Sequence, residues 1–301
     1  MFEKEGRPLI FGEVLFDEFA DGSAVLGGAP FNVAWHLQGF GLRPLLVSRV
    51  GQDERGELVF MRMLRWGMDM QAVQIDPLYP TGGVEVSLEE GEPDYVIRPA
   101  QAYDKISSAL VIDLVSHLPC SVLYCGSLAQ RDPVSRKTLQ RLLLEQALPV
   151  FVDINRRPPW FDEANISTTL HAATCVKMNA VELAAQTGLP TSDDKNLQRA
   201  MALLHAQYNI RHIYITQADK GASYFGEAGL QTALARQPRV FIDSIGAGDA
   251  FAAVCLLGQI RQWPVSTTLA RANGFASMVC EQRGALIEDQ AVYTRLLQEW
   301  A

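Results

Sequence analysis

A glycine-rich junction near the C-terminus constrains this chain more than any other segment: Asp243-Ser-Ile-Gly-Ala-Gly-Asp249. The apolar run from Val240 to Asp243 predicts a buried strand, and Ala250 to Gln262 predicts a helix. The two glycines then fall in the first turn of that helix. Backbone N–H groups in a first turn have no helical partner, and the helix dipole is positive there. The junction therefore predicts an anion-binding loop that suits a phosphoryl group.

One carboxylate stands beside this loop. Gly246, Ala247 and Gly248 would supply the amides, and Asp249 would accept a proton from an attacking hydroxyl group. The alternative is an ordinary strand-to-helix turn in which Asp249 only caps the helix. A dinucleotide fingerprint is excluded because Phe251 stands where it needs a third glycine, and the chain contains no GxxxxGK[ST] phosphate loop.

Composition excludes several classes of protein. The 301 residues are 48% apolar and 20% charged, which is enough for a full core, and the net charge of −8 argues against a nucleic-acid or anionic-membrane partner. No apolar run approaches the roughly 18 residues of a membrane span, and the N-terminus lacks the pattern of a signal peptide. Five cysteines without a CxxC pair indicate reduced thiols, so we expect a cytoplasmic protein.

Short apolar runs alternate with helical segments along most of the chain. This alternation predicts an α/β fold with a mostly parallel sheet covered on both faces. The expected strands are Pro8 to Phe11, Leu45 to Ser48, Val122 to Cys125, Val150 to Asp153, Cys175 to Met178, Ile213 to Thr216 and Val240 to Asp243.

One region breaks the alternation. Gly83 to Leu88 and Asp94 to Arg98 read as two extended segments around an acidic turn, which predicts a hairpin. The hairpin is either a flap over a pocket or an ordinary edge hairpin, and its pattern does not distinguish the two.

Other polar residues stand at helix starts and strand ends. Asn32 follows the Gly27-Gly28 turn and can bond a sugar hydroxyl group, although the turn alone explains the glycines. Asp17 follows the first strand, where ligands of open α/β sheets bind; a solvated loop acid is the alternative. Asn155 and Arg157 follow another strand, and Arg157 could neutralise a phosphate or form a surface ion pair.

Asn179 and Glu182 follow the strand that ends at Met178, spaced to share one helix face. They suit either a phosphate and magnesium–water site or a helix cap.

Taken together, these segments resemble the ribokinase or PfkB family of sugar kinases. Two signatures carry the resemblance in the expected order. The first covers Gly27-Gly28-Ala-Pro-Phe-Asn32-Val-Ala34 and Gly51-Gln-Asp53-Glu-Arg-Gly56, and the second covers Asp243-Ser-Ile-Gly246-Ala-Gly248-Asp249. The resemblance extends from about Leu9 to Ile287.

The resemblance implies a three-layer α/β/α ribokinase-like fold over residues 1–301, with lid strands at about 13–20 and 83–98. It implies ATP and Mg²⁺ as cofactors and transfer of the γ-phosphoryl group to a primary hydroxyl group of a free sugar. Asp249 would be the catalytic base and residues 246–248 the anion hole. The implied nucleotide site contains Asn179, Glu182, Thr216, Gly221, Asp243, Gly246, Gly248 and Asn273, with Glu182 holding Mg²⁺ through water. A monovalent cation such as K⁺ also binds in some members.

Within that family the motif forms are most similar to bacterial fructokinases, so D-fructose is the leading substrate. The similarity implies sugar contacts from Asp17, Gly28, Asn32, Tyr95, Arg98, Asn155 and Arg157. Three positions depart from the usual pattern. Ser244 replaces a threonine, Val254 replaces a small residue, and Ala218 replaces a glycine in the expected nucleotide loop, where a positive φ would disfavour a side chain.

Other readings of the same motifs remain. The substrate could be 2-keto-3-deoxygluconate, ribose or a nucleoside; Asp17 favours a neutral polyol, whereas Arg98 would suit an acidic sugar. A protein that senses a sugar without turnover is a further alternative, since a fold does not fix a function. The family also leaves open a homodimer formed through the lids.

Overall fold

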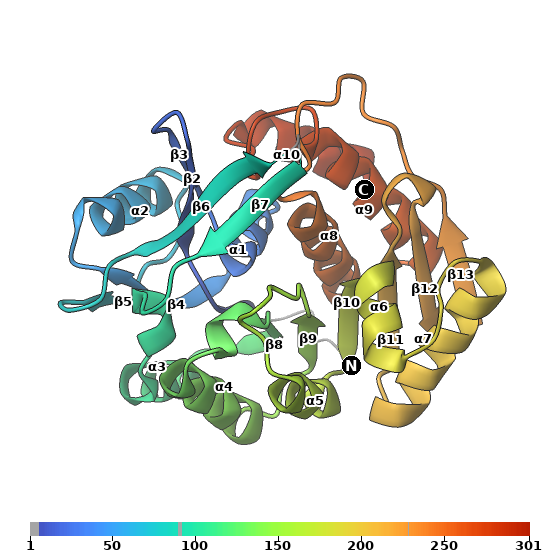
Figure 1. Cartoon of the computed structure of the whole chain (residues 1–301), viewed down its shortest axis with the longest axis horizontal. Coiled ribbons are helices and arrows are strands. Elements are labelled where there is room, and N and C mark those ends of the chain that lie inside the picture. The colour runs from blue at the N-terminus through green and yellow to red at the C-terminus, as the bar shows by residue number, and fades with distance from the viewer. Residues whose placement is uncertain (1–5, 90–91, 228) are drawn as a thin grey trace.

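The computed structural model describes residues 6–89, 92–227 and 229–301, and for residues 86–95 it describes no side chains. Its main element is a nine-stranded sheet in the order β13-β12-β11-β10-β9-β8-β1-β4-β5 (Figure 1). Every pairing from β5 to β11 is parallel, and only β12 and β13 run antiparallel. The strands are β1 (Arg7–Phe11), β4 (Leu45–Gly51), β5 (Val73–Asp76), β8 (Cys120–Cys125), β9 (Val150–Asp153), β10 (Cys175–Asn179), β11 (His212–Thr216), β12 (Ala222–Gly226) and β13 (Gly229–Ala233).

Both faces of this sheet are buried because successive side chains of a strand point to opposite sides. In β1, Ile10 packs into one hydrophobic cluster, while Leu9 and Phe11 pack into the other. The strands therefore read as continuous apolar runs, as expected for a parallel sheet between two helical layers.

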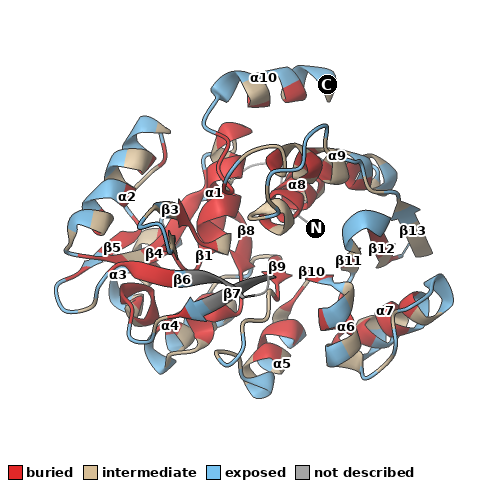
Figure 2. Cartoon of the chain, turned by 45° about the horizontal axis from the view of Figure 1, so that its top comes forward, coloured by how far each residue is buried: buried red, intermediate tan, exposed pale blue. Residues whose placement is uncertain are grey.

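Helices form the two outer layers, and Figure 2 shows α1 and α8 as mostly buried. On one side lie α1 (Ala29–Gly39), α2 (Glu54–Arg65), α8 (Ala247–Arg261), α9 (Val265–Val279) and α10 (Gln290–Glu299). On the other lie α3 (Ser108–Ser116), α4 (Pro133–Glu145), α5 (Glu163–Ala172), α6 (Ala180–Thr187) and α7 (Asp194–Tyr208). The α/β fold class and the mostly parallel sheet are thus confirmed.

A second sheet of four strands forms the lid, in the order β3-β2-β6-β7. Its strands are β2 (Leu15–Phe19), β3 (Ala24–Gly27), β6 (Gly82–Glu89) and β7 (Glu92–Ile97). The hairpin predicted from the sequence is β6 and β7, which pair antiparallel from Val84 with Ile97 onward. Because β2 pairs in parallel with β6, the hairpin is anchored to the chain segment that follows β1.

The strand predicted from Val240 to Asp243 is wrong. No strand forms there, and Val240, Phe241 and Ile242 are 64%, 65% and 52% exposed. The edge of the main sheet is instead occupied by β13, and the amide of Ile242 donates to the carbonyl oxygen of Cys280 in the adjoining helical layer. An apolar run predicts that its side chains are buried, but it does not distinguish burial in the protein core from burial against a ligand.

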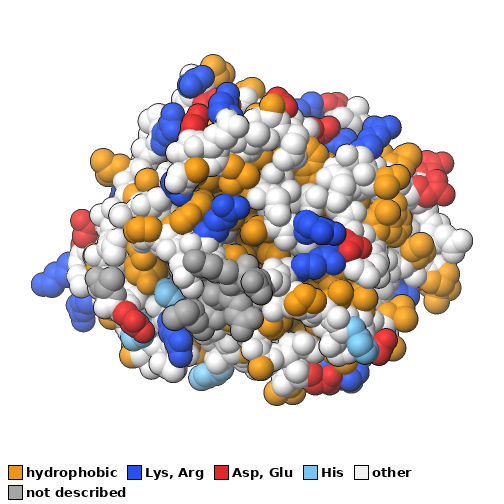
Figure 3. Space-filling view, turned by 180° about the vertical axis from the view of Figure 1, so that it is seen from behind, with side chains coloured by type: hydrophobic (Ala, Val, Ile, Leu, Met, Phe, Trp, Pro, Cys, Tyr) orange, Lys and Arg blue, Asp and Glu red, His pale blue; other side chains and the backbone are white. Residues whose placement is uncertain are grey.

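The outer surface carries charges of both signs. On the face seen in Figure 3, Lys and Arg side chains lie interspersed with Asp and Glu and with apolar groups, rather than in one basic field. Among the described residues, none of the helices is both long enough and apolar enough to cross a bilayer.

Candidate functional site

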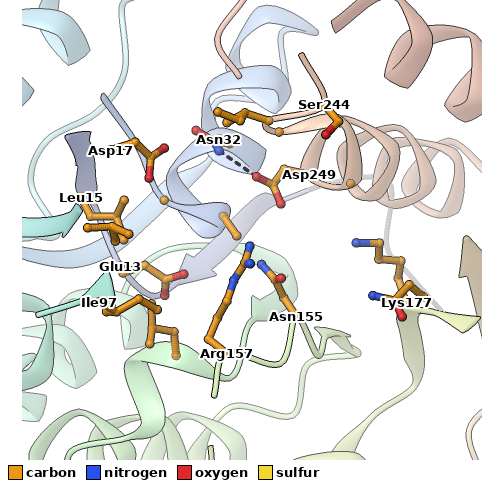
Figure 4. A pocket seen from close by; sticks show the side chains of 18 of the residues that line it. Glu13, Leu15, Asp17, Asn32, Ile97, Asn155, Arg157, Lys177, Ser244 and Asp249 are labelled. Carbon is orange, nitrogen blue, oxygen red and sulfur yellow. Dashed lines mark hydrogen bonds between the residues drawn. The ribbon is translucent and has the colours of Figure 1, made fainter. Parts of the chain in front are cut away.

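Two pockets open where the parallel strands end, the edge at which open α/β sheets bind ligands. The first, here called the polar pocket, has a volume of about 320 Å³ (Figure 4). It is lined by Glu13, Leu15, Asp17, Gly28, Ala29, Asn32, Val84, Ile97, Leu128, Asn155, Arg157, Lys177, Asn179, Glu182, Thr216, Ser244, Ile245, Gly246, Gly248 and Asp249. The main sheet, the N-termini of α1, α6 and α8, and the lid therefore all contribute to it.

The N-terminus of α8 forms one wall of the polar pocket. Gly246 caps the helix in the left-handed region, with φ of 77°, and an added Cβ would come within 2.2 Å of Cβ of Ala285. Only glycine fits this position without strain. The amide of Ala247 donates to the carbonyl oxygen of Ser244 at 3.2 Å. Within the described part of the chain, the amides of Gly246, Gly248 and Asp249 have no acceptor, so they are the donors available to an anion.

Asp249 lies in the first turn of α8 and is 9% exposed. Its Oδ2 accepts a hydrogen bond from Nδ2 of Asn32 at 2.7 Å, drawn as the dashed line in Figure 4. Burial raises the pKa of Asp249 above its usual value, and the charge of Lys177, the Asn32 bond and the charge of Arg157 oppose this. A carboxylate of raised pKa at a pocket wall is a stronger proton acceptor than an exposed one.

Asp17, on β2, lies across the polar pocket from Asp249. Burial raises the pKa of Asp17 to about 6, against the charge of Arg157. The turn that connects the lid to α1 lies beside Asp17. In this turn Gly28 has φ of 105°, and a Cβ added to Gly28 would lie 2.8 Å from the carbonyl oxygen of Glu13. The close backbone contact explains a glycine here.

Oδ1 of Asn32 is buried without a hydrogen-bond partner among the described residues, so it remains available to a ligand.

Lys177 supplies a buried cation at the floor of the pocket. Its Nζ lies 3.1 Å from both carboxylate oxygens of Asp153, and the two side chains are only 9% and 1% exposed. An added Cβ at Gly248 would lie 3.1 Å from the same Nζ, so the ammonium group sits against the first turn of α8. Desolvation lowers the pKa of Lys177, but the charges of Asp153 and Asp249 outweigh it and keep the group protonated.

Asn179 and Glu182 form a capping box at the start of α6. The Asn179 side chain accepts from the Glu182 amide, and Glu182 Oε2 accepts from the Asn179 amide, both at 2.8 Å. Oε1 of Glu182 accepts from the amide of Arg156 at 2.7 Å. The capping alternative is therefore present in the structure. It does not exclude a ligand role, since both residues line the pocket and each carboxylate oxygen can accept a second bond.

The second pocket, here called the apolar pocket, has a volume of about 430 Å³ and lies on the far side of the α8 N-terminus. It contains Thr216, Ala218, Gly221 and Asn273, and its walls include Phe241, Phe251, Ala276 and Pro238. The exposed run that contains Phe241 therefore faces a pocket. The two pockets share Asn179, Thr216, Ser244 and Gly248, so they meet at the amides of α8.

Two predicted nucleotide-site positions have constrained backbones. Gly221 has φ of 98°, and an added Cβ would lie 2.1 Å from the carbonyl oxygen of Ala233, so a side chain is excluded. Ala218 has φ of 50°, in the left-handed region. The substitution of alanine for the usual glycine thus carries a strain of roughly 1–2 kcal/mol in this loop.

Other predicted site residues are placed as follows. Asn155 and Arg157 line the polar pocket. Asp243 does not line the polar pocket; its carboxylate accepts from the amides of Ile245 and Gly284 and so holds the loop before α8.

Arg98 pairs with Glu18 and Glu85 on the lid and is absent from the lining of the polar pocket. The side chain of Tyr95 lies outside the described residues.

Asn273 lines the apolar pocket, and its Nδ2 donates to the carbonyl oxygens of Ala233 and Leu234 at 3.1 and 3.0 Å. It therefore ties α9 to the edge strand β13 beside this pocket.

Two charged residues of the polar pocket were not candidates from the sequence. Lys177 stood inside an apolar strand, and a charge in the middle of a buried parallel strand was the signal that could have found it. Glu13 directly follows Gly12 at the end of β1, the same kind of position that singled out Asp17.

The sequence and fold of this chain are similar to those of known carbohydrate kinases. The family model described as pfkB family carbohydrate kinase matches residues 9–290. Fructokinase from Klebsiella pneumoniae is 28% identical over 273 residues, which cover 84% of this chain and 84% of that protein. A double mutant of Vibrio cholerae O395 fructokinase, solved with fructose, ADP and potassium ion, has a TM-score of 0.80 at 24% identity, covering 97% of this chain and 98% of that one.

Arabidopsis thaliana ribokinase, solved with ribose and ATP, has a TM-score of 0.82 at 19% identity, covering 97% and 99% of the two chains. The fold is thus ribokinase-like. Because the family model spans most of the sequence, this chain belongs to the pfkB family of carbohydrate kinases.

The Lys177–Asp153 pair gives a first prediction. Lys177→Met leaves the Asp153 carboxyl group buried without its counter-ion, so we expect the free energy of unfolding at pH 8 to fall by about 3–5 kcal/mol. The double variant Lys177→Met/Asp153→Asn removes both charges and should lose less. Urea unfolding followed by circular dichroism measures both, and a double variant at least as unstable as the single one would contradict the ion-pair account.

Proposed function

We propose that this protein is an ATP-dependent sugar kinase that transfers the γ-phosphoryl group to a primary hydroxyl group of a free sugar, with D-fructose as the leading acceptor. The observation that carries the proposal is the meeting of a polar and an apolar pocket at the amides of α8 that no described residue accepts from. A group held by those amides is accessible from both pockets, which is the geometry that transfer between two ligands needs.

The polar pocket suits the sugar. Asp17 offers a carboxylate, and Asn32 offers an amide oxygen that has no hydrogen-bond partner among the described residues; both can accept hydrogen bonds from hydroxyl groups. Leu15, Val84 and Ile97 give the lid side of the pocket an apolar surface, against which the C–H groups of a sugar ring can pack. The fructose in the Vibrio cholerae structure and the fructokinase names of several relatives support this acceptor.

The apolar pocket suits the nucleotide. Phe241 and Phe251 offer apolar contact to a base, and Gly221 keeps the nearby loop close to the backbone of Ala233. From there, Thr216 and Asn179 lead to Gly248, so a triphosphate chain could run toward the amides of α8. The ADP and ATP of the two similar structures support this assignment.

Phosphoryl transfer depends mainly on positioning and on neutralising charge. The free amides of α8 and the ammonium group of Lys177 would stabilise the transferring group, and Arg157 adds a second positive charge. Asp249 would accept the proton of the attacking hydroxyl group while Asn32 holds its carboxylate in place. The lid would exclude water from the site.

Mg²⁺ fits the residues present. Glu182 lines the polar pocket with lone pairs left on both oxygens, and Mg²⁺ is commonly held through water by one or two carboxylates together with phosphates. When bound, the ion supplies charge neutralisation on the phosphates.

The rival acceptors differ in charge and shape. An acidic sugar would need a positive charge such as Arg98 in the pocket. Arg98 instead pairs with Glu18 and Glu85 on the lid and does not line the pocket. The carboxyl groups of Glu13 and Asp17 in the pocket disfavour an anionic acceptor. A coupled assay of ADP release over D-fructose, D-ribose, 2-keto-3-deoxygluconate and nucleosides tests the ranking, and D-fructose should give the highest kcat/KM. No turnover with any acceptor would favour the sugar-sensing alternative.

Asp249→Asn tests the base. We expect kcat with D-fructose to fall by roughly 10²–10⁴, because the amide cannot accept the proton. The variant still accepts the bond from Asn32 through its amide oxygen, so ATP binding by calorimetry and the melting temperature should stay close to wild type. Near-normal phosphorylation by this variant would contradict the assignment.

The pH dependence follows from the raised pKa of Asp249. A base works only when deprotonated, so activity is lost as the pH falls through that pKa. We expect the acidic limb of kcat/KM to have its midpoint above about 4, the usual value for Asp. The midpoint belongs to the cluster, since Asp17 titrates nearby at about 6. A profile that stays flat down to pH 4 would be inconsistent with this role.

A further inference from the structure

Glu13 lines the polar pocket, and the proposed phosphoryl transfer gives its carboxyl group no role. It lies two residues after the end of β1, is only 4% exposed and lines the pocket together with Arg157. In Figure 4 its carboxyl group points into the space between Asp17 and Arg157. Its Oε2 is buried and has no hydrogen-bond partner among the described residues.

The position of Glu13 is unfavourable for folding. A buried polar atom without a partner costs about 1–3 kcal/mol, and more when the group is charged. Burial raises the pKa of Glu13 to about 7; its own backbone amide opposes this shift, and the charge of Asp249 adds to it. Within the described chain, no donor compensates Oε2, so a compensating donor must come from what enters the pocket.

We propose that Glu13 is a specificity-determining residue whose carboxyl group accepts a hydrogen bond from a hydroxyl group of a neutral polyhydroxy acceptor. This inference rests on the proposed sugar-kinase function and deepens it. A terminal carboxyl group rotates readily, so either oxygen can turn toward the pocket. With Asp17, Glu13 gives the site two acceptors for hydroxyl hydrogens, which suits a polyol and disfavours a sugar acid.

The backbone fixes Glu13 relative to the rest of the sugar site. Its carbonyl oxygen would lie 2.8 Å from a Cβ added to Gly28, so the residue packs directly against the turn that leads to Asn32. The backbone of Glu13 is therefore held against the turn that leads to Asn32, which itself bonds Asp249. A hydroxyl group bound by Glu13 would thus be held in a fixed position relative to the proposed base.

Two substitutions test the role. Glu13→Met removes the acceptor at similar length, and Glu13→Gln keeps a neutral one. With D-fructose we expect Glu13→Met to raise KM roughly 10- to 100-fold, the range for a lost bond to a charged group, with kcat changed less than about 3-fold. Glu13→Gln should lie between Glu13→Met and wild type.

The same variants should gain stability, which a residue kept for folding would not allow. The raised pKa of Glu13 means that the folded state resists its ionisation, so its destabilising effect appears as the pH rises from about 4.5 to about 7. We expect the melting temperature of Glu13→Met to exceed that of wild type by at least about 2 °C at pH 8, and by less at pH 5. The charged and ionisable groups that act on Glu13 are Asp249, Arg157, Arg131, Tyr103 and Tyr124.

Asp76 provides the matched control. It is a buried carboxylate outside both pockets, 3% exposed, that pairs with Arg49 and accepts from the amides of Leu78 and Tyr79. Asp76→Asn should lower the melting temperature and leave KM for D-fructose unchanged.

These measurements distinguish a failure of the role proposed for Glu13 from a failure of the proposed kinase function. If wild type phosphorylates D-fructose while Glu13→Met keeps its KM, or if Glu13→Met melts below wild type at pH 8, the role of Glu13 is wrong and the kinase proposal stands. If wild type phosphorylates no sugar of the panel, the proposed function is wrong and the role of Glu13 falls with it.

Discussion

The amides at the N-terminus of α8 are the constraint on which the rest of the site depends. The helix is buried along nearly all of its length, yet its N-cap and first turn face two pockets, and three of their amides have no acceptor in the part of the chain that the structure describes. Gly246 makes this turn possible because its left-handed backbone and contact with Ala285 leave no room for a side chain. The carboxylate of Asp249 and the ammonium group of Lys177 lie at that positive helix end.

The surrounding charges form an arrangement that folding alone would not favour. Glu13, Asp17 and Asp249 are buried carboxyl groups around one small pocket, with raised pKa values caused first by burial. Lys177 and Arg157 oppose them only in part. Such a concentration of buried charge lowers stability and is typical of sites where protons and phosphates are handled. The two hydrophobic clusters on the faces of the nine-stranded sheet supply the stability that offsets it.

Much of this organisation could be predicted from the sequence. Parallel strands buried on both faces read as apolar runs, so six of the seven predicted strands are confirmed, and the glycines before α8 identified its N-terminus. The seventh, at Val240 to Asp243, failed because an apolar run that faces a pocket looks the same as one that faces a core. The lid strand β3 and the two antiparallel strands β12 and β13 gave no distinctive pattern.

The side chains of the site were less predictable. Arg98 stood at the end of the predicted hairpin, but nothing in its neighbours in sequence revealed that Glu18, eighty residues earlier, would hold it on the lid. Lys177 was hidden because pairing with Asp153 depends on the adjacency of β9 and β10, which no local pattern encodes. The spacing of Asn179 and Glu182 predicts a cap and a ligand site equally, and the capping box that forms leaves both possible.

The most direct test of the account is a crystal structure with D-fructose and a non-hydrolysable ATP analogue. We expect the γ-phosphoryl group to accept hydrogen bonds from the amides of Gly248 and Asp249, with a primary hydroxyl group of the sugar within about 3 Å of the Asp249 carboxylate. A terminal phosphate bound away from the α8 N-terminus, or a sugar whose primary hydroxyl groups all lie beyond reach of Asp249, would contradict it.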